Sequence, residues 1–313
     1  MAKFDENVNL IRKQEVRILN FLGTRKNREP YWYIAPAFII TMGVLILPLT
    51  YAVVISFLRW NLTRPDLKII WVGITNYIKN LSSPRFQDAA IVTLCYTVAL
   101  VISQLIIGFG FALLLQCKFW GRGVIRSLII LPMVIAPVVA GLIFRSLFFN
   151  TSFGYINYFL SLLGIDPVYW LSEIWTARFA VFITSLWLGV PFTMLILLSG
   201  LESLPISIYE AAQIDGTTPI QSFFLITIPL LKRTILVATI FQTISSLRLF
   251  DVPWIVTAGG PGISNLTMSI LAYKESMMLF RMGSGASQAM IILIITFIFA
   301  AGYINMMKED IDF

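Results

Sequence analysis

The chain has 313 residues, of which 58% are hydrophobic and 12% are charged, and it contains no histidine. A soluble domain of this size has about 25% charged residues, so the composition indicates a lipid environment. The absence of histidine excludes histidine-based metal sites, histidine proton relays and Ser-His-Asp triads. The net charge of +7 does not indicate nucleic acid, because the basic residues mark the ends of apolar runs and form no continuous stripe.

Six apolar runs are each close to the roughly 20 helical residues that cross a hydrocarbon core. Because lipid cannot satisfy exposed backbone polar groups, the chain is predicted to be an all-α, multi-pass membrane protein with a transmembrane domain at 31–307. The predicted spans are Tyr33–Phe57, Ile91–Leu115, Val124–Phe148, Arg178–Gly200, Ile235–Val256 and Gln288–Met307.

Lysine and arginine residues indicate the orientation. They cluster before the first span, between the second and third spans, and between the fourth and fifth spans. The positive-inside rule therefore predicts that both termini are cytoplasmic. Residues 1–30 are expected to form a basic amphipathic segment at the inner headgroup layer, and 308–313 a short cytoplasmic tail.

The cytoplasmic loop at 201–233 is too long for a tight turn and has the pattern of two short helices. Ser207 and Glu210 have capping-box spacing near the N-terminus of the first helix. Thr218 and Gln221 have the same spacing at the N-terminus of the second helix. Gly216 separates the helices, because glycine permits a positive φ at a helix end. The pattern predicts an ordered elbow, on which Glu210 is either a docking handle for a partner or a cap for its own helix.

The loop at 201–233 and four further elements of the chain resemble those of a known family. The loop matches the signature Glu-Ala-Ala-x3-Gly-x9-Ile-x-Leu-Pro of the permease subunits of binding-protein-dependent ABC importers, with one change, Ile228 for Leu. Four further elements are similar to the sugar-type branch and occur in the family's order. The elements are Gly73-Ile-Thr-Asn-Tyr77, Leu131-Pro132 with Pro137, Gly154-Tyr-Ile-Asn-Tyr158, and Phe250-Asp251 followed by Thr257-Ala-Gly-Gly-Pro261.

The resemblance implies a type I ABC importer permease in the cell inner membrane, with a cytoplasmic coupling helix and no catalytic activity of its own. It implies a second homologous permease, two ATP-binding cassette ATPases and an extracytoplasmic solute-binding protein as partners. ATP and Mg²⁺ are expected on the ATPases, because this chain has no Gly-x4-Gly-Lys-Ser/Thr loop; no metal or cofactor is expected on it. The residues implied in ATPase coupling are Glu210, Ala211, Ala212, Asp215, Gly216 and Pro229.

A substrate path is expected along the fifth span. An intramembrane charge is a functional candidate, although Arg248 and Asp251 could also satisfy each other at i,i+3 spacing. The candidate path residues are Gln104, Gln242, Ser246, Arg248 and Asp251. The turn at Gly259, Gly260 and Pro261 is either a contact for the solute-binding protein or a plain tight turn.

Two other classes of function fit the sequence less well. A self-sufficient secondary transporter or channel is the main alternative, but it should have paired membrane carboxylates or broken helices in corresponding halves. The predicted spans carry acidic residues only near their ends. An intramembrane enzyme is disfavoured because the chain has no convincing nucleophile constellation. The solute is expected to be a carbohydrate or a related polyhydroxylated molecule.

Overall fold

The computed structural model describes residues 29–64, 66, 68–117 and 119–309. The basic segment predicted at 1–30 lies almost entirely outside these residues, and so does most of the predicted tail. The chain forms two units, the first ending at Val54 and the second running from Ile55 to Phe313.

The first unit is one long apolar helix. It comprises α2 (Glu29–Thr41), a π-helical turn η1 (Met42–Ile46) and most of α3 (Leu47–Ser56). In its most apolar stretch only 6% of the residues are buried, as expected for a helix whose neighbours are lipid or other chains.

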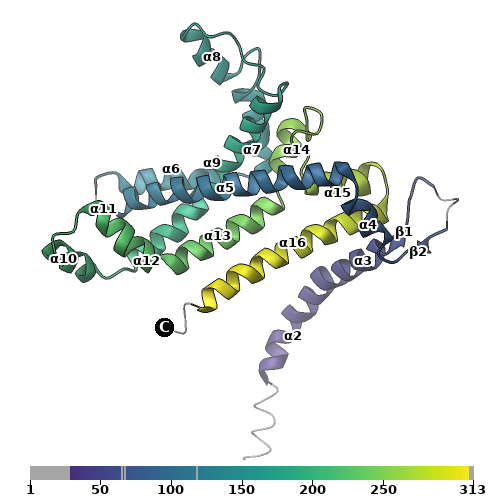
Figure 1. Ribbon diagram of the computed structural model, residues 1–313, viewed down its shortest axis with the longest axis horizontal. Helices are drawn as coiled ribbons and strands as arrows, with labels where there is room; N and C mark the ends of the chain where they lie inside the picture. Colours follow the sequence, from purple (N-terminus) through teal and green to yellow (C-terminus); the bar gives the residue numbers. More distant parts are fainter. Residues whose placement is uncertain (1–28, 65, 67, 118, 310–313) are drawn as a thin grey trace, which may run out of the picture. The chain divides into compact units, whose positions relative to one another are not determined.

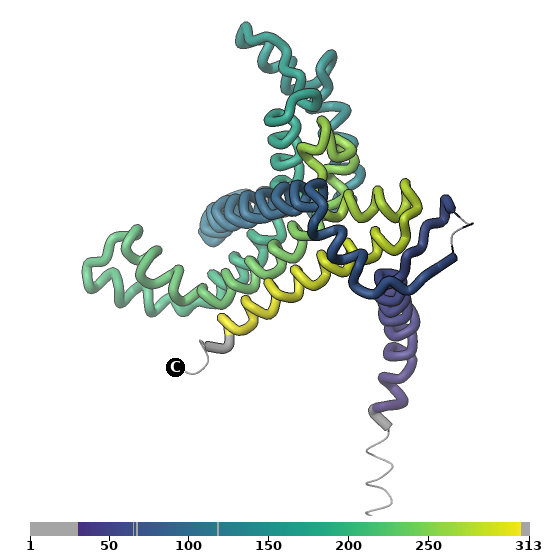
Figure 2. The backbone as a smooth tube through the Cα atoms, turned by 45° about the vertical axis from the view of Figure 1, so that its right-hand side comes forward, coloured from purple at the N-terminus to yellow at the C-terminus, as the bar shows by residue number. Residues whose placement is uncertain are grey.

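The second unit holds the remaining elements (Figures 1 and 2). Its strands β1 (Leu58–Arg59) and β2 (Ile70–Trp71) pair antiparallel, with Leu58 opposite Trp71. Its helices and π-helical turns are α4 (Thr75–Leu81), α5 (Pro84–Gln116), α6 (Arg122–Val134), α7 (Pro137–Ile143), η2 (Phe144–Phe148), α8 (Tyr155–Leu162), α9 (Ile174–Glu202), α10 (Ile206–Ile214), α11 (Pro219–Ser222), η3 (Phe223–Thr227), α12 (Ile228–Leu230), α13 (Lys232–Leu247), α14 (Asp251–Thr257), α15 (Met268–Tyr273), η4 (Lys274–Met278) and α16 (Met282–Glu309).

The multi-pass α-helical prediction is confirmed, with two spans corrected. Four helices among the described residues are long and apolar enough to cross a membrane, and up to six spans result if each of two bent helix pairs counts as one. The predicted third span is bent by 100° between α6 and α7. Ala136 precedes Pro137 and has a ψ of 134°, because the proline ring disfavours a helical conformation in the residue before it.

The predicted fifth span, Ile235–Val256, is also wrong as a single helix. α13 ends at Leu247, and α14 begins only at Asp251. Phe250 lies between them with φ −130° and ψ −58°, outside the helical region. The break removes the i,i+3 geometry that Arg248 and Asp251 would need for a self-contained pair within one helix.

The core is built on α5 and α9, which make the most extensive helix–helix contact of the chain. The two helices run parallel. The Tyr96 hydroxyl donates to the Arg178 carbonyl, and further along both helices Gln104 Nε2 donates to the Ser185 carbonyl. At the C-terminal ends of α5 and α9 a cluster of buried side chains joins both helices to the start of α13. The cluster consists of Ala112, Leu115, Met194, Leu197, Leu198, Leu201 and Leu231.

Gly108 allows the close approach of α5 and α9. A Cβ atom at this position would lie 2.9 Å from Thr193 Cγ2 and 3.1 Å from the backbone nitrogen of Met194. We expect Gly108→Leu to force the two helices apart and to cost about 1–3 kcal/mol, the usual cost of overpacking a core. The measurement is the apparent Tm of the purified protein in detergent.

Gly110→Leu is the matched control, because a Cβ at Gly110 would meet nothing within 4 Å. Its apparent Tm should stay close to that of the wild type. Equal losses in the two variants would contradict the assignment, because leucine has a higher helix propensity than glycine and only Gly108 lies at the contact with α9.

Candidate functional site

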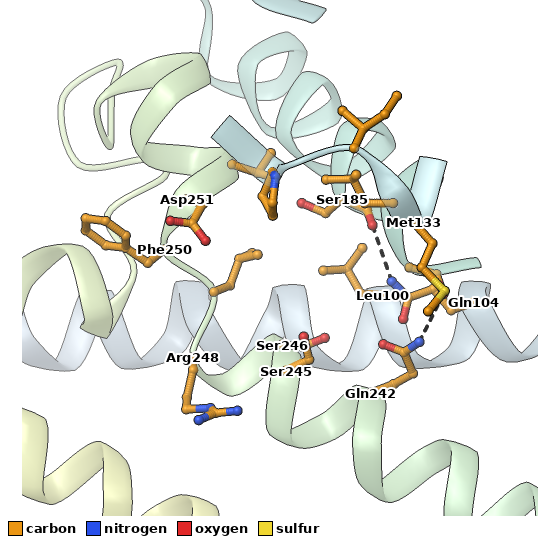
Figure 3. Close-up of a pocket in the computed structure, with 16 residues that line it drawn as sticks. Leu100, Gln104, Met133, Ser185, Gln242, Ser245, Ser246, Arg248, Phe250 and Asp251 are labelled. Atoms are coloured by element: carbon orange, nitrogen blue, oxygen red, sulfur yellow. Dashed lines mark hydrogen bonds between the residues drawn. The ribbon is translucent and has the colours of Figure 1, made fainter. Parts of the chain in front are cut away.

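The break between α13 and α14 opens onto a cavity of about 500 Å³ (Figure 3). Its walls come from α5, the α6–α7 break, α9 and the α13–α14 break, so both kinked segments contribute to it. All five path residues predicted from the sequence line this one cavity: Gln104, Gln242, Ser246, Arg248 and Asp251. The structure therefore brings together residues that are up to 147 positions apart in the sequence.

Two glutamines form the polar floor of the cavity. Gln242 Nε2 donates to the Gly189 carbonyl (3.0 Å) and to Thr193 Oγ1 (2.7 Å), which joins α13 to α9. Gln104 Nε2 donates to the Ser185 carbonyl at 3.4 Å, whereas Gln104 Oε1 is buried without a hydrogen-bond partner. An unpaired buried acceptor costs about 1–3 kcal/mol, so this oxygen is suited to accept a hydrogen bond from a bound hydroxyl group.

The two charged residues of the cavity do not pair with each other. Among the described residues, the ion pairs are Arg122–Glu202 and Arg281–Glu275. Arg248 is exposed, and its Nε donates to the Ile244 carbonyl at 3.3 Å. Figure 3 shows the Arg248 guanidinium directed away from Asp251, which lies in the first turn of α14. Each charge therefore remains available to a ligand or to a second subunit.

Other residues of the cavity were missed from the sequence. They include Met133, Ile135, Ser185, Leu188, Gly189 and Phe250. The prolines around the α6–α7 break and the Phe-Asp pair at 250–251 were visible signals. Only the folded chain shows that both breaks face the same space.

A second site is the elbow formed by α10, α11 and η3. The predicted capping box at Thr218 is confirmed, with the Thr218 and Gln221 side chains bonding to each other's backbone N–H groups. Gly216 has a φ of +79°, as predicted. The box predicted at Ser207 is wrong: α10 begins at Ile206, and its N-cap residue is Pro205, which has no side-chain donor or acceptor.

The elbow presents a mixed surface. Glu210, Ala211, Asp215, Gly216 and Pro229 are exposed, but Ala212 is buried at 6% exposure. Ala212 is therefore a packing residue of the elbow, and its carbonyl accepts from Thr217 Oγ1 at 2.7 Å. Three isoleucines that the sequence analysis did not single out are strongly exposed: Ile206 (73%), Ile214 (87%) and Ile220 (72%).

Hydrogen bonds connect the parts of the elbow, and an aromatic contact joins the elbow to α5. Tyr209 Oη and Thr227 Oγ1 lie 2.9 Å apart and join α10 to η3, while Thr217 Oγ1 and Ser222 Oγ lie 3.0 Å apart. The Phe223 ring packs edge-on against Phe109 of α5, with centroids 5.2 Å apart. Phe109 lies five residues from Gln104, so α5 connects the elbow with the cavity.

The chain is similar to known proteins in sequence and in fold. Residues 104–306 match the family described as binding-protein-dependent transport system inner membrane component. The chain belongs to this family. It is 35% identical to the trehalose/maltose transport system permease protein MalF of Thermococcus litoralis, over 88% of this chain and 93% of that protein. It is 33% identical to the sulfoquinovosyl glycerol transport system permease protein SmoG of Agrobacterium fabrum, over 88% and 89%.

A solved structure confirms the fold of the permease. A chain from a bacterial ABC transporter involved in the import of the acidic polysaccharide alginate superposes with a TM-score of 0.80 and 20% sequence identity, covering 92% of this chain and 98% of that one. The permease is thus an inner membrane component of an ABC transport system.

The permease holds the loop after α14 in place with buried hydrogen bonds. Asn265 Nδ2 donates to the Gly260 carbonyl at 2.6 Å, and Asn265 Oδ1 accepts from the Tyr96 hydroxyl. Gly259 is buried, and Gly260 and Pro261 are partly buried, so the exposed tip of the loop is Gly262 and Ile263.

Lys274 caps the end of α14 beside this loop. Its Nζ donates to the Ala258 carbonyl at 3.0 Å and lies 5.6 Å from the centre of the Trp254 ring. Burial, followed by the positive charge of Arg85, lowers the pKa of Lys274. The lysine therefore belongs to the support of the loop, and the exposed tip is free to make contacts.

Gln242 offers a test of the cavity floor. Gln242→Leu removes both hydrogen bonds to α9, each of which contributes about 0.5–1.5 kcal/mol, so we expect a loss of about 1–3 kcal/mol in stability. The apparent Tm of the purified permease should fall accordingly. Gln87→Leu is the control, because exposed Gln87 makes one hydrogen bond, to the Leu81 carbonyl; an equal loss there would contradict the assignment.

Proposed function

We propose that the permease forms half of the translocation path of an ATP-driven importer for a carbohydrate or a related polyhydroxylated solute. A second homologous permease forms the other half, two ATP-binding cassette ATPases drive it, and an extracytoplasmic solute-binding protein delivers the solute. The observation that carries the proposal is the cavity at the two helix breaks, in which every predicted path residue meets. ATP is expected on the ATPases, because this chain has no Gly-x4-Gly-Lys-Ser/Thr loop.

The chemistry of the cavity supports a carbohydrate. Sugars present many hydroxyl groups, and the cavity offers amide, hydroxyl and charged groups together with the ring of Phe250. Gln104 Oε1 has no partner within the protein and so provides an acceptor for a sugar hydroxyl. Relatives named as permeases for trehalose/maltose, sulfoquinovosyl glycerol and arabinooligosaccharides support the same class of solute.

The elbow supports coupling to an ATPase. Glu210 and Ala211 are exposed on a short helix that a hydrogen bond between Tyr209 and Thr227 joins to η3. The exposed isoleucines add apolar area that a cleft on another subunit would cover, and Glu210 adds a charge that a basic residue would pair. Movement of the elbow would reach the cavity along α5 through the Phe223–Phe109 contact. With both termini cytoplasmic, the elbow faces the ATPases.

A self-sufficient transporter or channel is the competing function, and ATP dependence separates the two. For the importer, uptake of a labelled saccharide into proteoliposomes requires ATP on the ATPase side and the solute-binding protein. Uptake that is driven by an ion gradient in the absence of ATP would contradict the proposal.

Gly216 tests the coupling role. Its φ of +79° is costly for a side chain with a Cβ atom, by about 1–2 kcal/mol, so Gly216→Leu should distort the elbow. No atom lies within 4 Å of a Cβ built there, so the chain should still insert. We expect ATP-dependent uptake to fall at least tenfold while membrane levels of the complex are unchanged.

Gly216→Asn is the matched control, because asparagine tolerates the left-handed region. It should keep most of the uptake activity. Full activity of Gly216→Leu would remove the elbow from the coupling mechanism.

Arg248 tests the path. In the complex with the solute-binding protein we expect Arg248→Ala to reduce substrate-stimulated ATP hydrolysis. If the solute is acidic, the loss of one charge contact should raise its half-saturating concentration about tenfold, which corresponds to roughly 1.4 kcal/mol.

Arg145→Ala is the control. Arg145 is also exposed and donates to the Ile255 carbonyl at 3.0 Å, but it does not line the cavity. If Arg248→Ala leaves the substrate dependence of ATP hydrolysis unchanged, Arg248 has a purely structural role.

A further inference from the structure

A groove outside the translocation path lies between the first halves of α5 and α9. It has a volume of about 480 Å³. Its α5 wall runs from Ile91 to Ala99, and its α9 wall from Trp175 to Phe182. The walls are almost wholly apolar, and the lining residues are Ile91, Val92, Cys95, Tyr96, Ala99, Trp175, Arg178, Phe179 and Phe182.

Arg178 is the one charged residue among those that line this groove. Arg178 is half-buried in the second turn of α9, and its Nε donates to the Ser264 carbonyl at 3.2 Å. Its guanidinium carbon lies 5.0 Å from the centre of the Trp175 ring. These contacts fix the orientation of the guanidinium. Neither ion pair found among the described residues involves Arg178, so its charge has no carboxylate partner there.

We propose that this groove binds one membrane phospholipid, with an acyl chain between α5 and α9 and the phosphate group on Arg178. The length of the groove fits this ligand. From Ile91 to Ala99, α5 rises by about 12 Å, and one leaflet of the hydrocarbon core is about 15 Å thick. Guanidinium groups bind phosphate oxygens through paired N–H donors, and the exposed Trp175 is of the type that lies at headgroup depth.

A second groove supports the assignment by contrast. It has a similar volume, about 490 Å³, and lies between α5, α6, η2 and α9. Its lining includes Phe111, Leu128, Trp187 and Pro191 but no charged residue. An acyl chain could occupy either groove, but only the groove at Arg178 has a group that recognises phosphate. The proposal therefore concerns a headgroup-selected site and not the general lipid contact of a membrane helix.

The two cysteines of the chain provide a probe and a reference. Cys95 lines the groove, whereas Cys117 follows the other end of α5; both are exposed. A bound acyl chain should shield Cys95 from N-ethylmaleimide and leave Cys117 reactive. Alkylation of each cysteine is followed by mass spectrometry of its peptide from the intact complex, so cysteines on other subunits do not interfere.

The experiment uses the complete complex, delipidated in a mild detergent and supplied with dioleoylphosphatidylglycerol. We expect this lipid to slow alkylation of Cys95 relative to Cys117 at least fivefold. Dioleoylglycerol, which lacks the phosphate group, should protect only at about tenfold higher concentration. Inorganic phosphate alone should not protect, because the shielding comes from the acyl chain.

Arg178→Gln tests the headgroup contact while it keeps a donor for the Ser264 carbonyl. We expect the phosphatidylglycerol concentration for half-protection of Cys95 to rise about tenfold, and Arg178→Lys to rescue most of the loss. Arg85→Gln is the control, because Arg85 is an exposed arginine in the first turn of α5 that does not line the groove. It should leave protection unchanged.

Three outcomes would overturn the proposal. Lack of alkylation at Cys95 in the delipidated complex would show that another part of the assembly covers the groove. Equal protection by the two lipids would show an acyl-chain contact without headgroup recognition. Unchanged protection in Arg178→Gln would remove the arginine from the site. Because the wild-type lipid titration needs no variant, the proposal stays testable even if Arg178→Gln does not assemble.

Discussion

The close parallel contact between α5 and α9 is the constraint on which the rest of the structure depends. It requires a small residue at Gly108, where Thr193 and Met194 of α9 leave no room for a side chain. It also places Gln104 against Gly189, at which a Cβ atom would overlap the Gln104 amide. The same contact that packs the two helices therefore positions the polar floor of the cavity, so the packing of the core and the geometry of the cavity depend on one surface.

Proline and backbone breaks shape the space above this floor. Pro137 ends the helical conformation at Ala136, and the chain leaves the helix again between Leu247 and Asp251. In lipid such breaks are tolerated where protein or a water-filled cavity surrounds the backbone, and both breaks line the same cavity here. The α13–α14 break adds the charged side chains of Arg248 and Asp251 to the cavity, whereas the α6–α7 break lines it with Met133, Ile135 and Pro137.

Much of this arrangement could be predicted from the sequence because its signals are local. Helix length in lipid follows from hydrophobicity, and the Gly216 turn and the Thr218 cap follow from backbone preferences of neighbouring residues. The start of α10 was misplaced at Ser207, because a capping pattern alone does not show whether the helix has already begun at Ile206. Ala212 belongs to the matched signature, yet it is buried, and only packing against its neighbours could show this.

By itself the sequence determined the lipid environment of this protein, its family and the ordered elbow in the loop at 201–233. Those properties depend on hydrophobicity, residue spacing and local backbone preference, which act over a few turns of helix. The tertiary structure decided that Gln104 and Gln242 meet at one cavity, that Arg248 does not pair with Asp251, and that Arg178 stands alone in an apolar groove. These facts depend on how distant helices approach one another, and that approach is set by the small residues and breaks that only the assembled fold brings together.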